Sequence, residues 1–122
     1  MKNELQKRLV TFGVNCIMTT NSIPAEFAIK HLYGQLVRSS TSAALNYGEA
    51  QTAETRKDFI HKLGIVLKEL KETEINLEMI IQTRLCKDIS PFIQCLGECR
   101  ELIAIFTATI KTAKSKIERG GC

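Results

Sequence analysis

The sequence predicts an all-α protein, folded as a single antiparallel, up-down-up-down four-helix bundle over residues 1–122. Apolar residues recur at steps of three and four along four segments, which is the spacing of one helix face. The chain has two prolines, no tryptophan and few β-branched runs of strand length. Its 122 residues suit one domain, and 44% apolar with 25% charged residues is a globular composition.

The first two predicted helices are defined by an apolar face and a proline between them. The face of the first consists of Leu5, Leu9, Phe12 and Cys16. This helix ends near residues 20–22, and Pro24 opens the second helix with Ser22 or Ile23 at the capping position. The face of the second consists of Ile29, Leu32, Leu36, Ala43, Tyr47 and Ala50, and this helix ends near residues 51–54.

The third and fourth predicted helices each have a start signal. Thr55 and Asp58 are spaced as a capping box for the third helix. Its apolar stripe consists of Phe59, Leu63, Val66, Leu70, Leu77 and Ile81. Residues 85–89 form a connection, and Ser90 followed by Pro91 starts the fourth helix. Its seam consists of Phe92, Leu96, Cys99, Ile103, Phe106, Ile110, Ala113 and Ile117. The short connections make neighbouring helices antiparallel.

A polar stripe borders the apolar face on each of the two middle helices. On the second helix it consists of Gln35, Arg38, Ser42, Asn46 and Glu49. On the third it consists of Asp58, Lys62, Glu69, Glu72 and Asn76. We expect the two stripes to meet, with Arg38 paired to Glu69 or Glu72 in a network that sets the helix register. A catalytic interpretation of Arg38, Glu49, Glu69 and Glu72 lacks a nucleophile–base pair, so we expect no enzymatic activity.

The cysteines indicate a reducing compartment rather than a metal site. There are five, at positions 16, 86, 95, 99 and 122, and this odd number without a secretory signal predicts free thiols in the cytoplasm. Cys95 and Cys99 are four residues apart, but His31 and His61 lie on other helices, so we expect no metal and no cofactor. The longest uncharged run, residues 9–25, is too short and too polar to span a membrane.

The net charge of +4 is concentrated at the two ends of the chain. The candidate nucleic-acid-binding residues are Lys2, Lys7, Arg8, Lys111, Lys114, Lys116 and Arg119. In an up-down bundle both chain ends lie at one end of the molecule, so we expect the positive charge to collect there. Phosphate binding strengthens with the number of such contacts. The alternative interpretation is that these lysines complement the dipole of the last helix and keep the protein in solution.

The polar stripes also carry a resemblance to a known family. The residues that match are Gln35, Leu36, Arg38, Ser39, Ser42, Asn46, Tyr47, Glu49, Ala50, Lys57, Asp58, Phe59, Leu63, Ile65, Leu67, Lys68, Glu69, Glu72 and Thr73. In type and spacing they resemble the bacterial four-helix-bundle proteins called intervening-sequence proteins, which are encoded within inserts in large-subunit ribosomal RNA genes. The sequence departs from the family's pattern at Ala44-Leu45 and at Ile75-Asn76, where relatives often have a small pair and an aromatic pair.

The resemblance implies a four-helix bundle that assembles into a ring-like homopentamer. It also implies a relation to the accessory variability protein of diversity-generating retroelements, which binds nucleic acid through a basic surface and partners a reverse transcriptase. Two functions follow as hypotheses. The first is an accessory protein that contacts the phosphates of RNA or DNA. The second is a protein-interaction scaffold, with a partner such as a reverse transcriptase and no nucleic-acid binding.

Overall fold

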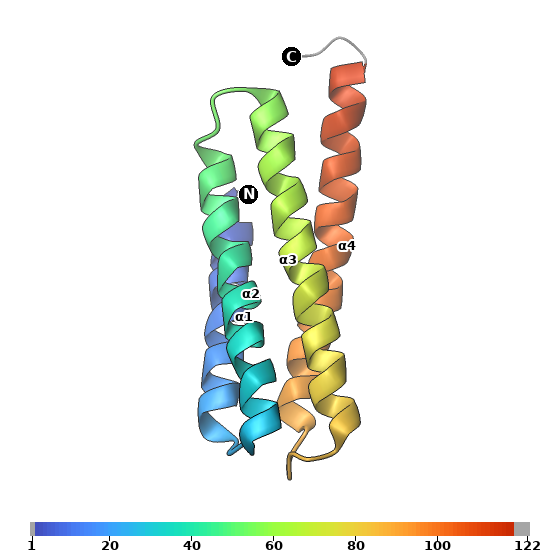
Figure 1. Cartoon of the computed structure of the whole chain (residues 1–122). Helices are drawn as coiled ribbons and strands as arrows, with labels where there is room; N and C mark the ends of the chain where they lie inside the picture. The colour runs from blue at the N-terminus through green and yellow to red at the C-terminus, as the bar shows by residue number, and fades with distance from the viewer. Residues whose placement is uncertain (1, 119–122) are drawn as a thin grey trace.

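The computed structural model describes the backbone of residues 2–118 and the side chains of residues 4–118. In this part of the chain there are four α-helices: α1 (Lys2–Ser22), α2 (Phe27–Gln51), α3 (Arg56–Thr83) and α4 (Ser90–Glu118). Consecutive helices run antiparallel and lie side by side as a bundle (Figure 1). The predicted all-α four-helix bundle is therefore confirmed.

The four helices differ in length and in how closely they pack. The packing of α2 on α3 is the most extensive, and that of α1 on α4 is the least. In Figure 1, α1 begins well short of the turn between α2 and α3, whereas α4 reaches that turn. We call this end of the molecule the turn end. It is built mainly from α2, α3 and α4, so the side of α4 that would face α1 is open there.

The helix starts follow local capping chemistry, with one correction to the sequence prediction. The side chain of Thr55 accepts a hydrogen bond from the backbone N–H of Asp58 at 3.0 Å, which caps α3. The second helix does not begin at Pro24. The N–H of Ile23 still bonds to the carbonyl of Thr19 in α1, so residues 24–26 are needed to reverse the chain, and α2 begins at Phe27.

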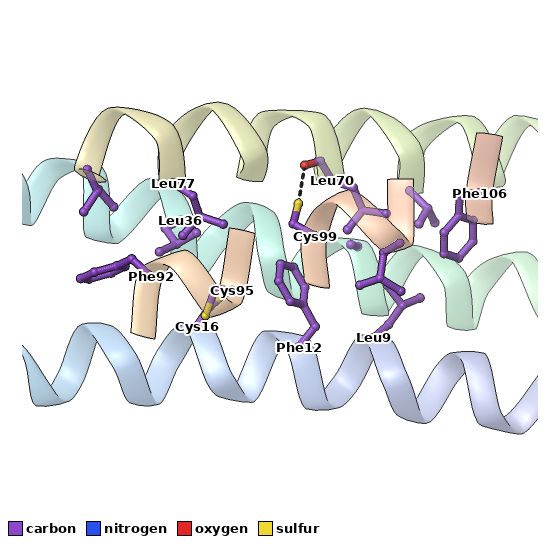
Figure 2. Close-up of a cluster of buried hydrophobic side chains, with 14 of the residues drawn as sticks. Leu9, Phe12, Cys16, Leu36, Leu70, Leu77, Phe92, Cys95, Cys99 and Phe106 are labelled. Carbon is purple, nitrogen blue, oxygen red and sulfur yellow. Dashed lines mark hydrogen bonds between the residues drawn. The ribbon is translucent and has the colours of Figure 1, made fainter. Parts of the chain in front are cut away.

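The hydrophobic core runs along the bundle axis (Figure 2). On α4 the buried stripe includes Cys95 and Leu102 at positions where the sequence predicted Leu96 and Ile103. Leu96 and Ile103 are half-buried and pack against the edge of the core. The difference arises because α4 lies against both α1 and α3, so its buried face is wider than a single seam.

Candidate functional site

The polar stripes of α2 and α3 meet around Arg38. Its Nη1 donates to Glu69 Oε2 at 3.0 Å, and its Nη2 donates to Glu72 Oε1 at 2.8 Å. A third, longer bond of 3.4 Å joins Nη2 to Glu69 Oε1. The planar guanidinium thus spans two carboxylates one helical turn apart on α3. A shift of either helix by one turn would break all three bonds, so these contacts select the register of α2 on α3.

Glu69 is the unusual member of this network because it is buried. Only 7% of the residue is exposed, whereas 56% of the Arg38 side chain is open to solvent. Burial alone would raise the pKa of the Glu69 carboxyl. Hydrogen bonds from Ser42 and Arg38, together with the Arg38 charge, outweigh burial and lower this pKa below its ordinary value. The carboxylate is therefore held in its charged form by α2.

Two buried hydroxyl groups extend the network into the core. Ser39 and Thr73 are both fully buried, and their hydroxyl oxygens lie 2.6 Å apart. The Thr73 hydroxyl donates to the carbonyl of Glu69 at 2.8 Å. Both residues belong to the family resemblance, but periodicity alone did not select them. Their positions in the sequence could have identified them. Ser39 directly follows Arg38, and Thr73 lies one helical turn after Glu69, each on the inner side of its stripe.

Other predicted members of the stripes contact neighbours farther along the same boundary. The Asn46 amide donates to the Ser42 carbonyl at 2.9 Å and to the Ser42 hydroxyl at 3.0 Å, both within α2. Glu49 accepts a hydrogen bond from Lys62 across the boundary between α2 and α3. These contacts are partly exposed, so they add less to stability than the buried contacts of Glu69.

Gln35 and Asp58 lie at the two extremes of the predicted network. Gln35 is exposed at the rim of an open cavity, which is lined by Arg38 of α2 and by α3 residues that include Glu72 and Ile75. Asp58 is exposed in the first turn of α3, where its backbone N–H bonds to Thr55. The structure therefore places Asp58 in the helix cap, separate from the Arg38 contacts.

Arg8, on α1, does not join the basic residues at the end of α4. Arg8 donates from Nε to Glu98 at 2.7 Å and from Nη2 to Glu101 at 3.0 Å. From Glu98 to Lys114 the axis of α4 rises by about 24 Å at 1.5 Å per residue. The predicted pooling of positive charge is therefore wrong for Arg8, because α4 is longer than α1. Its charge is already balanced by the two carboxylates.

The remaining residues of the predicted basic set fall into three groups. Lys7 is exposed on α1. The side chain of Lys2 and the whole of Arg119 lie outside the described residues. The other three, Lys111, Lys114 and Lys116, are exposed on the last turns of α4, at the turn end. Among the described side chains, no ion pair involves these three lysines.

Arg56, which sequence reasoning missed, lies beside this end of α4. It is the first residue of α3 and lines a cavity of about 310 Å³ together with Thr109, Thr112 and Lys116. Its Nε atom is buried, and no group of the described chain accepts a hydrogen bond from it. Its position directly after the capping residue Thr55 could have identified it. In an up-down bundle the α2–α3 turn and the end of α4 lie at the same end, so a residue at the start of α3 lies near the last turns of α4.

The described residues lack both a cluster of metal ligands and a membrane-spanning helix. Residues 2–118 contain no group of three or more His, Cys, Asp or Glu side chains placed to hold a metal ion. Among those residues, no helix combines the length and the apolar character needed to cross a membrane. Cys16, Cys86, Cys95 and Cys99 are free and buried, and Cys122 lies outside the described residues.

Comparisons with known proteins agree with this architecture. The model of a family described as "23S rRNA-intervening sequence protein" matches residues 1–108. The chain is also similar to a crystal structure from Bacteroides thetaiotaomicron, described as a protein with unknown function from the S23 ribosomal protein family. That match has 31% identity and a TM-score of 0.76, and it covers 91% of this chain and 99% of the other. The comparison with curated proteins finds no match.

Proposed function

The chain belongs to the 23S rRNA-intervening sequence protein family, and from that premise we propose that it is an oligomeric, non-enzymatic accessory protein that binds RNA or DNA phosphates. The binding surface is the turn end of the bundle. We call its exposed cations on α4 the lysine cluster, which consists of Lys111, Lys114 and Lys116. The alternative is a protein-interaction scaffold with no nucleic-acid binding.

The observation that carries the proposal is that three exposed lysines without a carboxylate partner gather within six residues at one end of α4, whereas the other unpaired lysines of the described chain, such as Lys30, Lys71 and Lys87, are scattered over the bundle. Arg8, Arg38, Lys62 and Arg100 each pair with one or two carboxylates. Within the described side chains, the lysine cluster has no such pairs. An ammonium group that is exposed and not neutralised by a carboxylate keeps its charge for a phosphate. The acidic residues Glu54, Asp58 and Glu118 lie in the same segments, so the excess at this end is modest for one subunit.

The unpartnered nitrogen of Arg56 supports the same surface. A buried N–H group without an acceptor carries a free-energy cost, which a phosphate oxygen would remove once the Arg56 side chain turns toward the cavity. The cavity beside it also presents the hydroxyl groups of Thr109 and Thr112 and the ammonium group of Lys116. These groups suit the oxygens of the sugar-phosphate backbone, and contacts to that backbone carry no sequence information. We therefore expect binding with little sequence preference.

A charge-reversal experiment tests the surface. We expect the triple variant Lys111→Glu, Lys114→Glu, Lys116→Glu to bind a fluorescent single-stranded RNA at least about tenfold more weakly than the wild type in anisotropy titrations. The matched control is Lys30→Glu, Lys71→Glu, Lys87→Glu, which changes the net charge equally at exposed positions elsewhere. We expect this control to retain most of the affinity. Equal losses in both variants, or no binding by the wild type, would contradict the proposed surface.

We further propose that the protein assembles as a homopentamer. A row of apolar side chains on the outer face of α1 supports a subunit contact: Val10, Val14, Ile17 and Met18, which are 39–56% exposed. These residues are spaced by four, three and one, so they form one side of the helix. Repeated around a ring, each copy of this row can be covered by a neighbouring subunit, and the lysine cluster would be present five times.

Native mass spectrometry tests this assembly. The wild type is expected at five times the chain mass of 13.7 kDa. We expect Val14→Lys to dissociate the ring, because a charge buried in an apolar contact is costly. Lys7→Ala, an exposed change on the same helix, serves as the control and should leave the mass unchanged. A wild type that is monomeric at micromolar concentration would refute the ring.

The second candidate, a protein-interaction scaffold, is favoured by a different observation at the opposite end of the bundle. Phe27 is 89% exposed and Leu85 is 60% exposed, and both lie by the connections at that end. Large exposed aromatic and aliphatic side chains of this kind often contact partners. A scaffold would show no salt-dependent nucleic-acid binding, and Phe27→Ser would weaken the binding of its protein partner.

A further inference from the structure

Two cysteines face each other across the boundary between α1 and α4. Cys16 is fully buried on α1, and Cys95 on α4 is 6% exposed. Figure 2 shows their sulfur-bearing side chains together in the core, and each thiol shifts the pKa of the other. They come from the two helices whose mutual packing is the least extensive in the bundle.

A cavity gives the solvent a route to one member of this pair. Its volume is about 290 Å³, and it opens between the end of α1 and the start of α4. Its lining includes Cys95, Thr19, Asn15, Gln94 and Glu98, but not Cys16. A small polar solute can therefore reach Cys95 first, and Cys16 lies behind it. This asymmetry separates an accessible thiol from a protected one.

The surroundings also give the two thiols different acidities. The neighbouring Cys16 thiol lowers the pKa of Cys95 to about 7, against the opposing effect of burial, and the Thr19 hydroxyl 3.9 Å away adds to the lowering. The same interaction raises the pKa of Cys16. A thiolate is the reactive form of cysteine, so Cys95 suits the attacking role and Cys16 the role of the thiol that attacks second.

We propose that Cys16 and Cys95 form a peroxide-reactive pair that closes to a disulfide between α1 and α4. The Cys95 sulfur attacks one oxygen of hydrogen peroxide, the O–O bond breaks, and one water leaves as Cys95 becomes a sulfenic acid. The Cys16 sulfur then attacks the Cys95 sulfur, the S–O bond breaks, and a second water leaves. Two thiols and one peroxide thus give one disulfide and two waters.

The other buried cysteines lack this arrangement and serve as internal controls. Cys99 is fully buried, donates a hydrogen bond to the Leu70 carbonyl at 3.2 Å, and has its pKa raised to about 12, mainly by burial. Cys86 lies 3.5 Å from the Tyr33 hydroxyl, near the opposite end of the bundle from the lysine cluster. Neither lines the cavity that reaches Cys95.

The test uses the full chain, reduced and then freed of reductant, with hydrogen peroxide as the probe. We expect the intact mass to fall by two hydrogen atoms, and digestion without reductant to give one cross-linked peptide pair that joins Cys16 to Cys95. Trypsin leaves Cys95 and Cys99 in one peptide, so a second cleavage after Glu98 is needed to separate them. A cross-link through Cys99, or oxidation without any link to Cys16, would overturn the proposal.

Three variants sharpen the assignment. Cys16→Ala should leave Cys95 as a sulfenic acid that a dimedone probe labels, whereas Cys95→Ala should show no label at Cys16. Cys99→Ala, the matched buried control, should form the disulfide as fast as the wild type. Circular dichroism checks that each variant is folded. The wild-type mapping decides the proposal even if a variant fails to fold, because it requires no substitution.

Discussion

At the residue scale, the structure separates two arginines that look alike in exposure and partner number. Arg38 and Arg100 each have 56% of the side chain exposed, and each reaches two carboxylates on α3. The difference lies in the partners. The side chain of Glu69 is 10% exposed, whereas those of Glu74 and Glu78 are 27% and 39% exposed. Loss of Arg38 therefore leaves a buried charge without its partner.

We predict that Arg38→Ala lowers the free energy of unfolding by about 1–2 kcal/mol, because an uncompensated buried carboxylate is costly. For a chain of this size that corresponds to a melting temperature lower by about 4–8 °C. The matched variant Arg100→Ala should cost about 0–1 kcal/mol, as partly exposed ion pairs do. Thermal unfolding followed by circular dichroism measures both. Equal effects of the two substitutions would refute the buried-partner argument.

The lowered pKa of Glu69 predicts a pH dependence. Its pKa lies below the ordinary value of 4.5, so its stabilising effect is complete above that value and is lost as the pH falls through the lower, folded-state pKa. The wild type should therefore be more stable than Glu69→Gln at neutral pH, and the difference should shrink as the pH falls below 4.5. Urea unfolding at fixed protein concentration measures it. A difference that stays constant or widens in acid would show that the carboxylate charge is not the stabilising feature.

Residue-scale sequence reasoning identified the Arg38 contacts because helical geometry places Arg38, Glu69 and Glu72 next to apolar faces that must pack. The same reasoning was wrong for Arg8 and silent on Arg56. The position of Arg8 depends on where α1 begins relative to the end of α4, and that of Arg56 on where α3 begins relative to it. Helix periodicity carries no information on such an axial offset. The buried hydroxyl groups of Ser39 and Thr73 were missed as contacts because small polar residues contribute weakly to an apolar pattern.

At the element scale, the end of α3 contains the one left-handed non-glycine residue of the described chain. Arg84 has φ 57° and ψ 22° at the C-cap, which is a left-handed conformation that glycine usually adopts at this position. A side chain there costs about 1–2 kcal/mol relative to the right-handed region. The six residues from Arg84 to Ile89 then return the chain to α4.

We predict that Arg84→Gly stabilises the protein by about 0.5–1 kcal/mol, since glycine relieves the left-handed strain but adds entropy to the unfolded chain. The control Arg84→Ala removes the charge and keeps the Cβ atom, so it should bring no comparable gain. Urea midpoints of the three proteins decide the question. A glycine variant that is less stable than the alanine variant would contradict the account.

The order and type of all four elements could be predicted from sequence because long amphipathic segments leave few packed alternatives. The start of α2 could not, since Pro24 is as compatible with a connection as with a first turn. The extension of α1 through the Ile23–Thr19 hydrogen bond decides between them, and no residue in the sequence marks that bond as favoured over an earlier helix end. The buried stripe of α4 is centred closer to Cys95 and Leu102 than the sequence predicted, because α1 packs against that side of the helix.

At the scale of the whole molecule, charge and assembly are linked. One subunit has five basic and three acidic residues in the segments 52–61 and 108–118 that build the turn end. That excess is small for a nucleic-acid surface, but a ring repeats it five times within one particle. Under our proposal, affinity for phosphates depends on the assembly as much as on the lysine cluster. Ring-breaking and charge-reversing substitutions should therefore both weaken binding.

The most direct measurement is the salt dependence of RNA binding by the assembled wild-type protein. Anisotropy titrations at several salt concentrations give the slope of log K against log salt, which is about −0.7 for each phosphate neutralised on a single strand. We predict a slope of about −2 or steeper, as three or more lysine contacts require, and a shallower slope for the triple lysine-to-glutamate variant. A flat dependence, or no binding at low salt, would contradict the account and leave the scaffold as the function to pursue.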